Sequence, residues 1–348
     1  MKKAIAILLA VIMTALLFGC SKEPEIQATT TTTTTTTTQP APSVYNPFTG
    51  DSNFDESAVG RRPVAIVVEN SPFARPQWGI DTPDIIVEGE VEGGISRMLW
   101  LYADYNTVPN KVGPIRSARP SFVEFSELFD AVFVHWGGSH NKGNYIGGYG
   151  VFGRDNVAHI DGMAGGPLFG RDTTRSVSSE HRGIVHGDKM AQVIEKKDCR
   201  KEYSKSRFTK FDFYDDVHDA GTDPAGTLSC RFSSRTDTRK FSFSADDGKY
   251  HCGDWKTDVQ FQNVIVLRAD TTYITTPYKG STTTYLNYSI TSGTGFYASN
   301  GKVQPIKWDA SSGRLKLTDG DGNALSLNKG NSYIGLASSN NGGRVSYQ

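Results

Sequence analysis

The hydrophobic residues in the first half of the chain fall into short, nearly continuous runs. Two of these runs, at residues 63–68 and 131–136, are rich in β-branched side chains and too short for a buried helix. We therefore predict two strands that are buried on both faces, as in the parallel sheets of α/β proteins. A third run, at residues 95–103, predicts another strand.

Residues 120–129 have the pattern of a helix that joins two of these strands. Pro120 and Ser121 open it, and Ser121 and Glu124 have the spacing of a capping box. One apolar stripe runs along it, formed by Phe122, Phe125 and Phe129. The succession of strands and helices predicts an α/β domain with a mixed or partly parallel sheet. Ligands of such sheets bind beyond the carboxyl ends of the strands, where His135 falls.

The segment from residue 82 to residue 94 supports two structures. Its first residues, Thr-Pro-Asp, are typical of a helix start, whereas the β-branched residues that follow favour a strand that turns at a glycine pair. Either structure puts Glu88 and Glu92 on one face, because residues four positions apart lie on the same side of a helix and also on the same side of a strand.

The next part of the chain is irregular. Residues 139–167 are rich in glycine and predict long loops over a site or at an edge. They contain neither a dinucleotide-binding motif nor a P-loop, so binding of phosphate by such a loop is not indicated. Asp188 has the position of a helix cap and predicts a helix to Lys197. We place a domain boundary near Ser204.

From residue 208 onward, hydrophobic and polar residues alternate with a period of two. Short clusters of Asp, Ser and Gly separate the alternating segments, as in half-buried strands joined by turns. We therefore predict that the α/β domain over residues 45–204 is followed in the chain by a mainly β domain over residues 205–348. This second domain is expected to be a sandwich or barrel-like unit. Residues 319–323 lack two key positions of a calcium loop and predict a hairpin turn.

The composition is that of a globular protein with balanced charge. The 348 residues include 37 basic and 37 acidic side chains, which give a formal net charge of zero. This balance gives no electrostatic reason to expect a nucleic acid partner. The length suits two ordinary domains.

The N-terminus predicts export and lipid attachment. Two lysines precede an apolar run at residues 4–18 that is too short to span a bilayer comfortably. The tetrapeptide LFGC, which ends at Cys20, resembles a bacterial lipobox. We therefore expect a lipoprotein signal peptide over residues 1–19 and a membrane anchor of acyl chains such as palmitate on Cys20. The threonine-rich residues 20–44 predict a flexible tether.

Three further cysteines remain, Cys199, Cys230 and Cys252. An odd number allows at most one disulfide, and the sequence does not choose the pair. Neither the cysteines nor the histidines have the spacing of a zinc site, so we predict no metal and no cofactor.

Several blocks of the sequence are similar to the YerB-like bacterial lipoproteins. GPIRSARP and VEGGISR are long enough to be specific, and VHWGGS, HIDGM, RDTTR and NVIVL add to them. The resemblance extends over nearly all of the chain after the tether. It implies an N-terminal and a C-terminal domain of unknown function behind a lipid anchor, on the extracytoplasmic face of the membrane, and it implies no particular reaction.

The family pattern also marks individual positions. The residues that agree with it are Arg75, Glu88, Glu92, Gly93, Gly94, Arg97, Arg116, Ser117, Arg119, His135, Asp161, Arg171, Asp172, Arg175 and His181. Glu90 departs, because an apolar residue is usual there, and the chain departs again directly after His181.

Four of these residues form a candidate catalytic or structural cluster, Glu88, Glu92, His135 and Asp161. Paired carboxylates such as Glu88 and Glu92 act as general acid and base where their surroundings separate the two pKa values. The alternative is a structural cluster of salt bridges with nearby arginines. His135 has the same two interpretations, as a base or as a buried histidine that donates to a backbone carbonyl.

A second set consists of candidate ligand-binding residues. Arg116 and Arg119 lie between two prolines and could form a fork for a carboxylate, a phosphate or a sugar acid. The alternative is that they bond carbonyl groups and fix a loop. The full set is Arg75, Arg97, Arg116, Ser117, Arg119, Arg171 and Asp172.

These features together predict a lipid-anchored protein on the outer face of a bacterial cell membrane. We expect it to bind or assemble an anionic component of the cell envelope, and the alternative is an envelope-polymer hydrolase or transferase. Trp78, Trp100 and Trp136 are expected in the core rather than on a platform that stacks sugars. The oligomeric state stays open.

Overall fold

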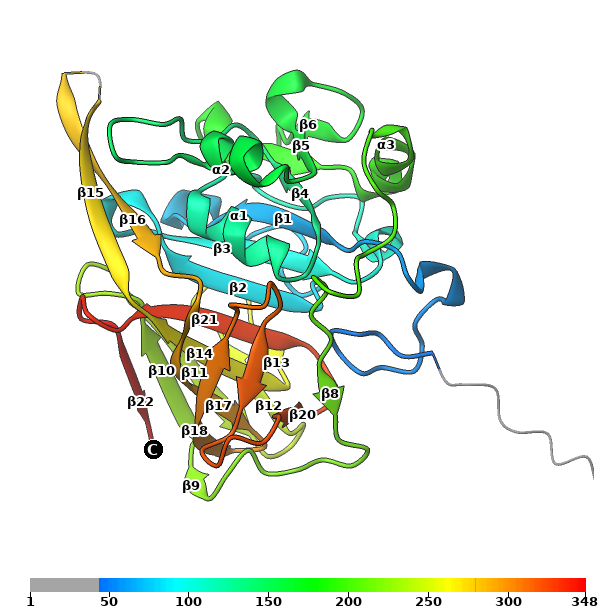
Figure 1. Ribbon diagram of the computed structural model, residues 1–348, viewed down its shortest axis with the longest axis vertical. Coiled ribbons are helices and arrows are strands. Elements are labelled where there is room, and N and C mark those ends of the chain that lie inside the picture. Colours follow the sequence, from blue (N-terminus) through cyan, green and yellow to red (C-terminus); the bar gives the residue numbers. More distant parts are fainter. Residues whose placement is uncertain (1–43, 279) are drawn as a thin grey trace, which may run out of the picture. The chain divides into compact units, whose positions relative to one another are not determined.

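The computed structural model of the chain describes residues 44–278 and 280–348 (Figure 1). The expected signal peptide, Cys20 and the threonine tract lie outside the described residues. Within the described ranges, none of the helices has the length and apolar character needed to cross a bilayer.

A mixed sheet of eleven strands is the centre of the fold, and both halves of the chain contribute to it. The strand order is β19-β18-β17-β14-β21-β2-β3-β1-β4-β5, and β9 pairs with β18 beside this path. Five strands come from the first half: β1 (Val64–Glu69), β2 (Ile85–Glu90), β3 (Ser96–Tyr102), β4 (Val132–His135) and β5 (His159–Asp161). Six come from the second half: β9 (Asp223–Pro224), β14 (Asn263–Ala269), β17 (Ser292–Ser299), β18 (Lys302–Asp309), β19 (Lys316–Thr318) and β21 (Ser332–Ser338).

Parallel and antiparallel pairs are mixed in this sheet. β1 runs parallel to β4, and β4 runs parallel to β5, so the carboxyl ends of these three strands meet at one edge. β3 runs antiparallel to both β1 and β2. The predicted strands at residues 63–68, 95–103 and 131–136 are confirmed, and so is a partly parallel sheet in the first half.

The halves are joined by the parallel pair of β2 and β21, in which Val87 is opposite Ile334. Strands from both sides of Ser204, where the sequence predicts a domain boundary, therefore belong to one sheet. All of the described residues belong to one compact unit.

A second sheet of five strands comes entirely from the later half, which is mainly β as predicted. Its order is β13-β12-β11-β10-β22. The bounds are β10 (Thr227–Arg231), β11 (Thr238–Ser244), β12 (Lys249–Cys252), β13 (Val259–Phe261) and β22 (Arg344–Tyr347). The described β structure also includes three two-stranded pairs: β6 (Phe169–Arg171) with β7 (Gly183–Val185), β8 (Asp212–Phe213) with β20 (Ser326–Leu327), and β15 (Thr271–Tyr278) with β16 (Ser281–Tyr288).

The helices of the described residues are short. They are α1 (Pro120–Glu127), α2 (Gly148–Asp155) and α3 (Met190–Lys196). Single 3₁₀ turns accompany them: η1 (Glu56–Ala58), η2 (Pro72–Ala74), η3 (Glu92–Gly94), η4 (Tyr105–Thr107), η5 (Gly162–Ala164), η6 (Ser179–His181) and η7 (Gly187–Lys189). α1 and α3 lie where helices are predicted, and η7 precedes α3.

The predicted capping box of α1 is wrong. Arg119 occupies the N-cap position, and no side chain caps the helix. The Ser121 hydroxyl instead accepts a hydrogen bond from the backbone N–H of Tyr288, 2.9 Å away. The hydroxyl that we assigned to the capping box therefore binds a distant segment of the chain instead.

The central sheet is covered on both faces. On β1, Ala65 and Val67 face one core cluster together with Phe122 of α1, and Figure 1 shows α1 in front of this part of the sheet. The alternate residues of β1, such as Ile66, face a second cluster that includes Met190 of α3 and side chains of the five-stranded sheet. Burial on both faces explains why these strands have continuous apolar runs.

The ambiguous segment at residues 82–94 forms strand β2 and then the turn η3. The strand alternative is therefore correct, and Thr-Pro-Asp does not start a helix. Gly94 adopts a φ of 73°, and a Cβ atom at this position would lie 2.8 Å from the carbonyl oxygen of Arg235. The turn requires glycine there for both reasons.

Candidate functional site

Glu88 lies in the middle of β2 and is enclosed by protein. Its carboxylate accepts hydrogen bonds from Asn70 Nδ2 at 2.6 Å, from Ser96 Oγ at 2.5 Å and from Tyr333 Oη at 2.9 Å. Arg239 of β11 adds two more, at 2.6 Å and 3.1 Å. The side chain has no solvent exposure.

The electrostatics of Glu88 are those of a structural ion pair. Burial by itself would raise its pKa, but the charge of Arg239 and the surrounding hydrogen bonds outweigh burial and leave the pKa below its ordinary value. A fully bonded, enclosed carboxylate has no open position for a substrate. Arg75 lies at the edge of the same network, because it donates to Asn70 Oδ1 at 3.1 Å and to the carbonyl of Asp254 at 3.1 Å.

Glu92 belongs to a separate network. Its carboxylate accepts from Arg119 Nε at 2.7 Å, and Arg97 Nη2 lies 3.6 Å away. Arg97 also donates to the carbonyl of Ser117 at 2.9 Å. Burial would raise the pKa of Glu92, but the two guanidinium groups lower it to about 2. Glu88 and Glu92 therefore bind different arginines.

Arg116 and Arg119 also go to different partners. Arg119 binds Glu92, whereas Arg116 Nε is 3.6 Å from Glu69 and Arg116 Nη2 is 3.1 Å from Glu180. The two arginines thus do not form a common fork. Arg116 keeps a partly exposed position, and Glu180 is an exposed partner.

His135 is fully buried at the end of β4. Its Nδ1 donates to the carbonyl of Gly137 at 2.7 Å, and its Nε2 is 3.0 Å from Nδ1 of His159. Burial lowers the pKa of His135. These contacts agree with the interpretation as a buried histidine that donates to a backbone carbonyl.

A cavity of about 330 Å³ lies beyond the carboxyl ends of β4 and β5. Arg116 and Ser117 line one part of it, and Trp136, which directly follows β4, lines another. Arg171 of β6 places its guanidinium carbon 4.4 Å from the centre of the Trp136 ring. The other lining residues are Ile115, Gly137, Gly138, His140, Tyr149, Met163, Glu180 and Gly183.

Asp161, the last residue of β5, fixes the shape of this cavity. Its carboxylate accepts from the backbone N–H of Gly137 at 2.8 Å, from that of Met163 at 2.9 Å and from the Tyr149 hydroxyl at 2.6 Å. These hydrogen bonds outweigh burial and lower the pKa of Asp161. Asp161 therefore holds three wall segments together.

The candidate ligand-binding residues thus lie in three different places. Arg116, Ser117 and Arg171 line one cavity. Asp172 does not face it, because its carboxylate is bonded by Lys111 and by Thr174. The remaining members serve the buried networks described above: Arg75, Arg97 and Arg119.

Some residues of this cavity were missed in the sequence. Trp136 is half-buried: it packs against the core cluster that contains Ile66 and also lines the cavity, so the expectation of a core residue holds for only part of its surface. Tyr149 and Glu180 come from segments without a recognisable motif. Glu69 does not line the cavity but contacts Arg116, and the strand-end argument that selected His135 could have found it, because it is the last residue of β1.

The cysteines, histidines and acidic residues that the structure describes do not gather into a metal site. Cys199, Cys230 and Cys252 all carry free thiols. Across residues 44–278 and 280–348, no group of three or more histidine, cysteine or acidic side chains is placed to hold a metal ion.

Comparison with known proteins places the chain in a family. Residues 48–200 match the N-terminal domain, and residues 228–334 match the C-terminal domain, of a family described as "Protein of unknown function (DUF3048)". These two ranges together span well over half of the chain. The chain belongs to the DUF3048 family.

The sequence relative and the solved structure that resemble this DUF3048 protein both carry the name YerB and come from Bacillus subtilis. A protein of strain 168 named "Putative lipoprotein YerB" is 46% identical over 93 residues, a match that spans 27% of this chain and 27% of that protein. The crystal structure of the YerB protein has a TM-score of 0.69 at 24% identity and covers 87% of this chain and 99% of that chain, which establishes a shared fold. The resemblance to the YerB-like lipoproteins is therefore confirmed, and the named relative supports a lipoprotein of unknown function.

Proposed function

We propose that this DUF3048 protein is a membrane-anchored lipoprotein of the bacterial envelope that binds an anionic carbohydrate in the cavity beyond β4 and β5. Acyl chains on Cys20 would hold it at the extracytoplasmic face, and residues 20–44 would act as the tether. The observation that carries the proposal is the position of Arg171 at this cavity.

Arg171 offers an unneutralised positive charge. Its guanidinium donates to the carbonyl of Ser179 and lies over Trp136, and it has no carboxylate partner in the part of the chain that the structure describes. Guanidinium groups bind carboxylates and phosphates through paired hydrogen bonds. An anion in the cavity would complete the bonding of Arg171.

Arg116 can contribute a second guanidinium group. Its exposed partner, Glu180, keeps 57% of its side-chain surface in solvent. Exposed ion pairs contribute only about 0–1 kcal/mol. A ligand carboxylate can therefore replace Glu180 at low cost, while the buried Glu69 keeps Arg116 in place.

The remaining walls suit a sugar ring. Trp136 and Tyr149 present aromatic surface, and the His140 ring stacks on Tyr149 with 4.8 Å between ring centres. Aromatic rings of this kind combine apolar faces with polar edges. Gly183 contributes space, because a Cβ atom there would come within 3.0 Å of the Trp136 ring.

The alternative, a hydrolase or transferase that uses Glu88, Glu92 and His135, gains no support from the geometry. Glu88 and His135 are enclosed, and Glu92 is neutralised by two arginines. Glu88 and His135 thus have no position open to a substrate, and the partly exposed Glu92 is held by its two arginines.

Calorimetric titration with glucuronate tests the proposal, with glucose as the neutral control. Glucuronate should bind the full chain, and Arg171→Gln should weaken binding by about tenfold or more, which corresponds to ~1.4 kcal/mol. Arg154→Gln is the matched control, because Arg154 is an exposed arginine paired with Glu124 and absent from this cavity. Equal affinity for glucose and glucuronate, or full affinity in Arg171→Gln, would refute the proposal.

A further inference from the structure

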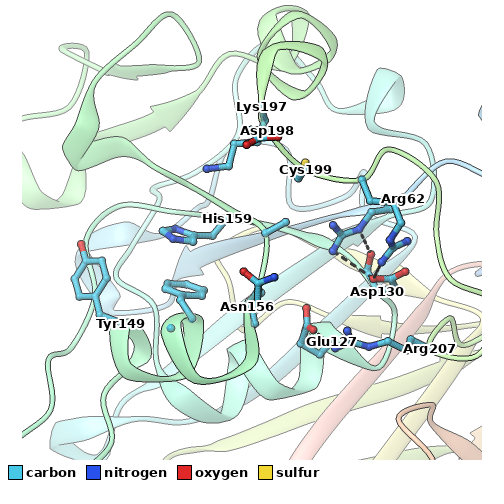
Figure 2. A pocket seen from close by; sticks show the side chains of 15 residues that line it. Arg62, Glu127, Asp130, Tyr149, Asn156, His159, Lys197, Asp198, Cys199 and Arg207 are labelled. Carbon is cyan, nitrogen blue, oxygen red and sulfur yellow. Dashed lines mark hydrogen bonds and ion pairs between the residues drawn. The ribbon is translucent and has the colours of Figure 1, made fainter.

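A second cavity, of about 580 Å³, is lined by the side chains shown in Figure 2. Its walls come from α1, α2, β5 and the segment that follows α3. Tyr149 lines both cavities. The side chains that matter here are His159 and Lys197.

Hydrogen bonding fixes the tautomer of His159. The carbonyl of Gly137 can only accept, so Nδ1 of His135 must carry the hydrogen of their 2.7 Å bond. Nε2 of the neutral His135 then accepts, and Nδ1 of His159 donates to it over 3.0 Å. Nε2 of His159 is therefore left with a lone pair.

This lone pair belongs to an oriented, neutral ring. His159 stacks on Phe152 with 4.0 Å between ring centres and an angle of 5° between the planes, and both rings line the cavity. Burial, followed by the neighbouring His135 and the charge of Lys197, lowers the pKa of His159 to about 4. At neutral pH the ring is uncharged, and Nε2 can only accept a hydrogen bond or bind an electrophile.

The charges of the cavity favour an anion. Four cationic side chains line it against three carboxylates, so one positive charge is in excess. Asp130 is shared by Arg62 and Arg200, and Arg207 is paired with Glu127. The third carboxylate, Asp198, directly follows Lys197 in the chain and is not bonded to it. The Lys197 ammonium group has no hydrogen-bonded or ion-paired partner within the described residues, and it lies close enough to His159 to affect its pKa.

A second acceptor is also unsatisfied. Glu127 Oε1 is buried and has no hydrogen-bond partner in the part of the chain that the structure describes. Buried polar atoms of this kind are normally bonded by protein or by a bound molecule. Glu127 Oε1 has almost no accessible surface, so the unbonded groups left for a ligand are Nε2 of His159 and the Lys197 ammonium group.

We propose that this cavity binds a polyol phosphate, whose phosphate group pairs with Lys197 and whose hydroxyl group donates to Nε2 of His159. A hydroxyl group can donate to Nε2 of His159, whose lone pair is fixed by the hydrogen bonds from His159 to His135 and from His135 to Gly137. An ammonium group acts as a point charge, which suits the spherical charge of a phosphate group. The site shares no charged side chain with the carbohydrate cavity that contains Arg171.

Calorimetry on the full chain tests this assignment with glycerol 3-phosphate, inorganic phosphate and glycerol. Glycerol 3-phosphate should bind about tenfold or more tightly than inorganic phosphate, because only the ester supplies the hydroxyl donor. Lys197→Met should weaken its binding by about tenfold or more. Lys196→Met is the matched control, because Lys196 is an exposed neighbour that does not line this cavity.

Nitrogen NMR of histidine-labelled protein gives a test without any substitution. His159 should show a protonated Nδ1 and an unprotonated Nε2, and the Nε2 resonance should move when glycerol 3-phosphate is added. His159→Phe keeps the stack on Phe152 and should reduce glycerol 3-phosphate to the affinity of inorganic phosphate. Its melting temperature is measured first, because the substitution leaves Nε2 of His135 without a donor.

Three outcomes would overturn the assignment. They are equal affinity for glycerol 3-phosphate and inorganic phosphate, unchanged affinity in Lys197→Met, and a protonated Nε2 on His159. The two proposals fail independently. Glycerol 3-phosphate binding tests the cavity that contains Lys197, whereas glucuronate binding and Arg171→Gln test the cavity that contains Arg171.

Discussion

Glu88 of β2 and Arg239 of β11 form a buried ion pair that joins the central sheet to the five-stranded sheet. Arg239 Nη2 lies 2.6 Å from Glu88 Oε1, and the two side chains are 0% and 5% exposed. The residues are 151 positions apart in the sequence. The pair therefore fixes the contact between the two sheets of one compact unit.

Replacing one partner of this pair should destabilise the protein strongly. We expect Glu88→Gln to lower the free energy of unfolding by about 3–5 kcal/mol, because Arg239 would keep a buried charge without its main counter-ion. Urea denaturation followed by tryptophan fluorescence measures the change. Glu56→Gln, at an exposed position, is the control and should stay within about 0.5 kcal/mol of the original protein.

The double variant Glu88→Gln with Arg239→Gln distinguishes the energy of the pair itself from the other contacts of the two side chains. Its loss of stability should be smaller than the sum of the two single losses, because the second substitution removes the uncompensated charge. A loss below about 1 kcal/mol in Glu88→Gln would show that the pair does not hold the sheets together.

Acid should weaken the fold through Glu92. A carboxyl group whose folded pKa is lowered stabilises the fold above its unfolded pKa, and this stabilisation disappears as the pH falls through the folded pKa. For Glu92 the window runs from about 4.5 down to about 2. The loss across it is on the order of 3 kcal/mol.

The pH effect is measured by urea denaturation from neutral pH down to about pH 3. Glu92→Gln removes the titrating group, so the stability of the variant should fall less steeply in this range. Parallel curves for the two proteins would mean that Glu92 has the same pKa in both folded and unfolded states.

The glycine pair after β2 offers a matched comparison of two positive-φ positions. Gly93 has a φ of 76° with open space around it, whereas a Cβ atom on Gly94 would lie 2.8 Å from the Arg235 carbonyl. Gly93→Ala should cost about 1–2 kcal/mol, the cost of the left-handed conformation alone. Gly94→Ala should cost more, because the backbone must also move. Equal melting temperatures for the two variants would contradict this difference.

The sequence predicts local features of this fold better than its long-range contacts. The apolar runs at residues 63–68 and 131–136 predict β1 and β4, because burial on both faces imposes a pattern that is visible within six residues. The partner of Glu88 could not be predicted, because Arg239 lies in an alternating strand whose pattern does not mark charge pairing. The Ser121 hydroxyl was misassigned for the same reason, since its partner is the backbone of Tyr288.

The candidate site divides in the same way. His135 pointed to the correct edge of the sheet, because parallel strands place their carboxyl ends together. Arg116 was selected from its local motif and does line the cavity there. Arg119 came from the same motif but binds Glu92, and a local motif does not show which distant carboxylate each arginine will reach.

Arg116 and Arg171 line the same cavity but should differ in their effect on stability. Arg171→Gln should leave the melting temperature unchanged, because Arg171 is exposed and bonds only a carbonyl and a ring face. Arg116→Gln should lower the free energy of unfolding by about 1–2 kcal/mol, because Glu69 is buried and loses its arginine partner.

Thermal unfolding and glucuronate titration of both variants check this difference. Both substitutions should weaken glucuronate binding, and only Arg116→Gln should also lower the melting temperature. Glu69 would still accept from His181 Nδ1 at 2.8 Å and from Ser71 Oγ at 2.8 Å, which limits the destabilisation. A large loss of stability in Arg171→Gln would mean that this side chain serves the fold, and the carbohydrate site would then lose its main cation.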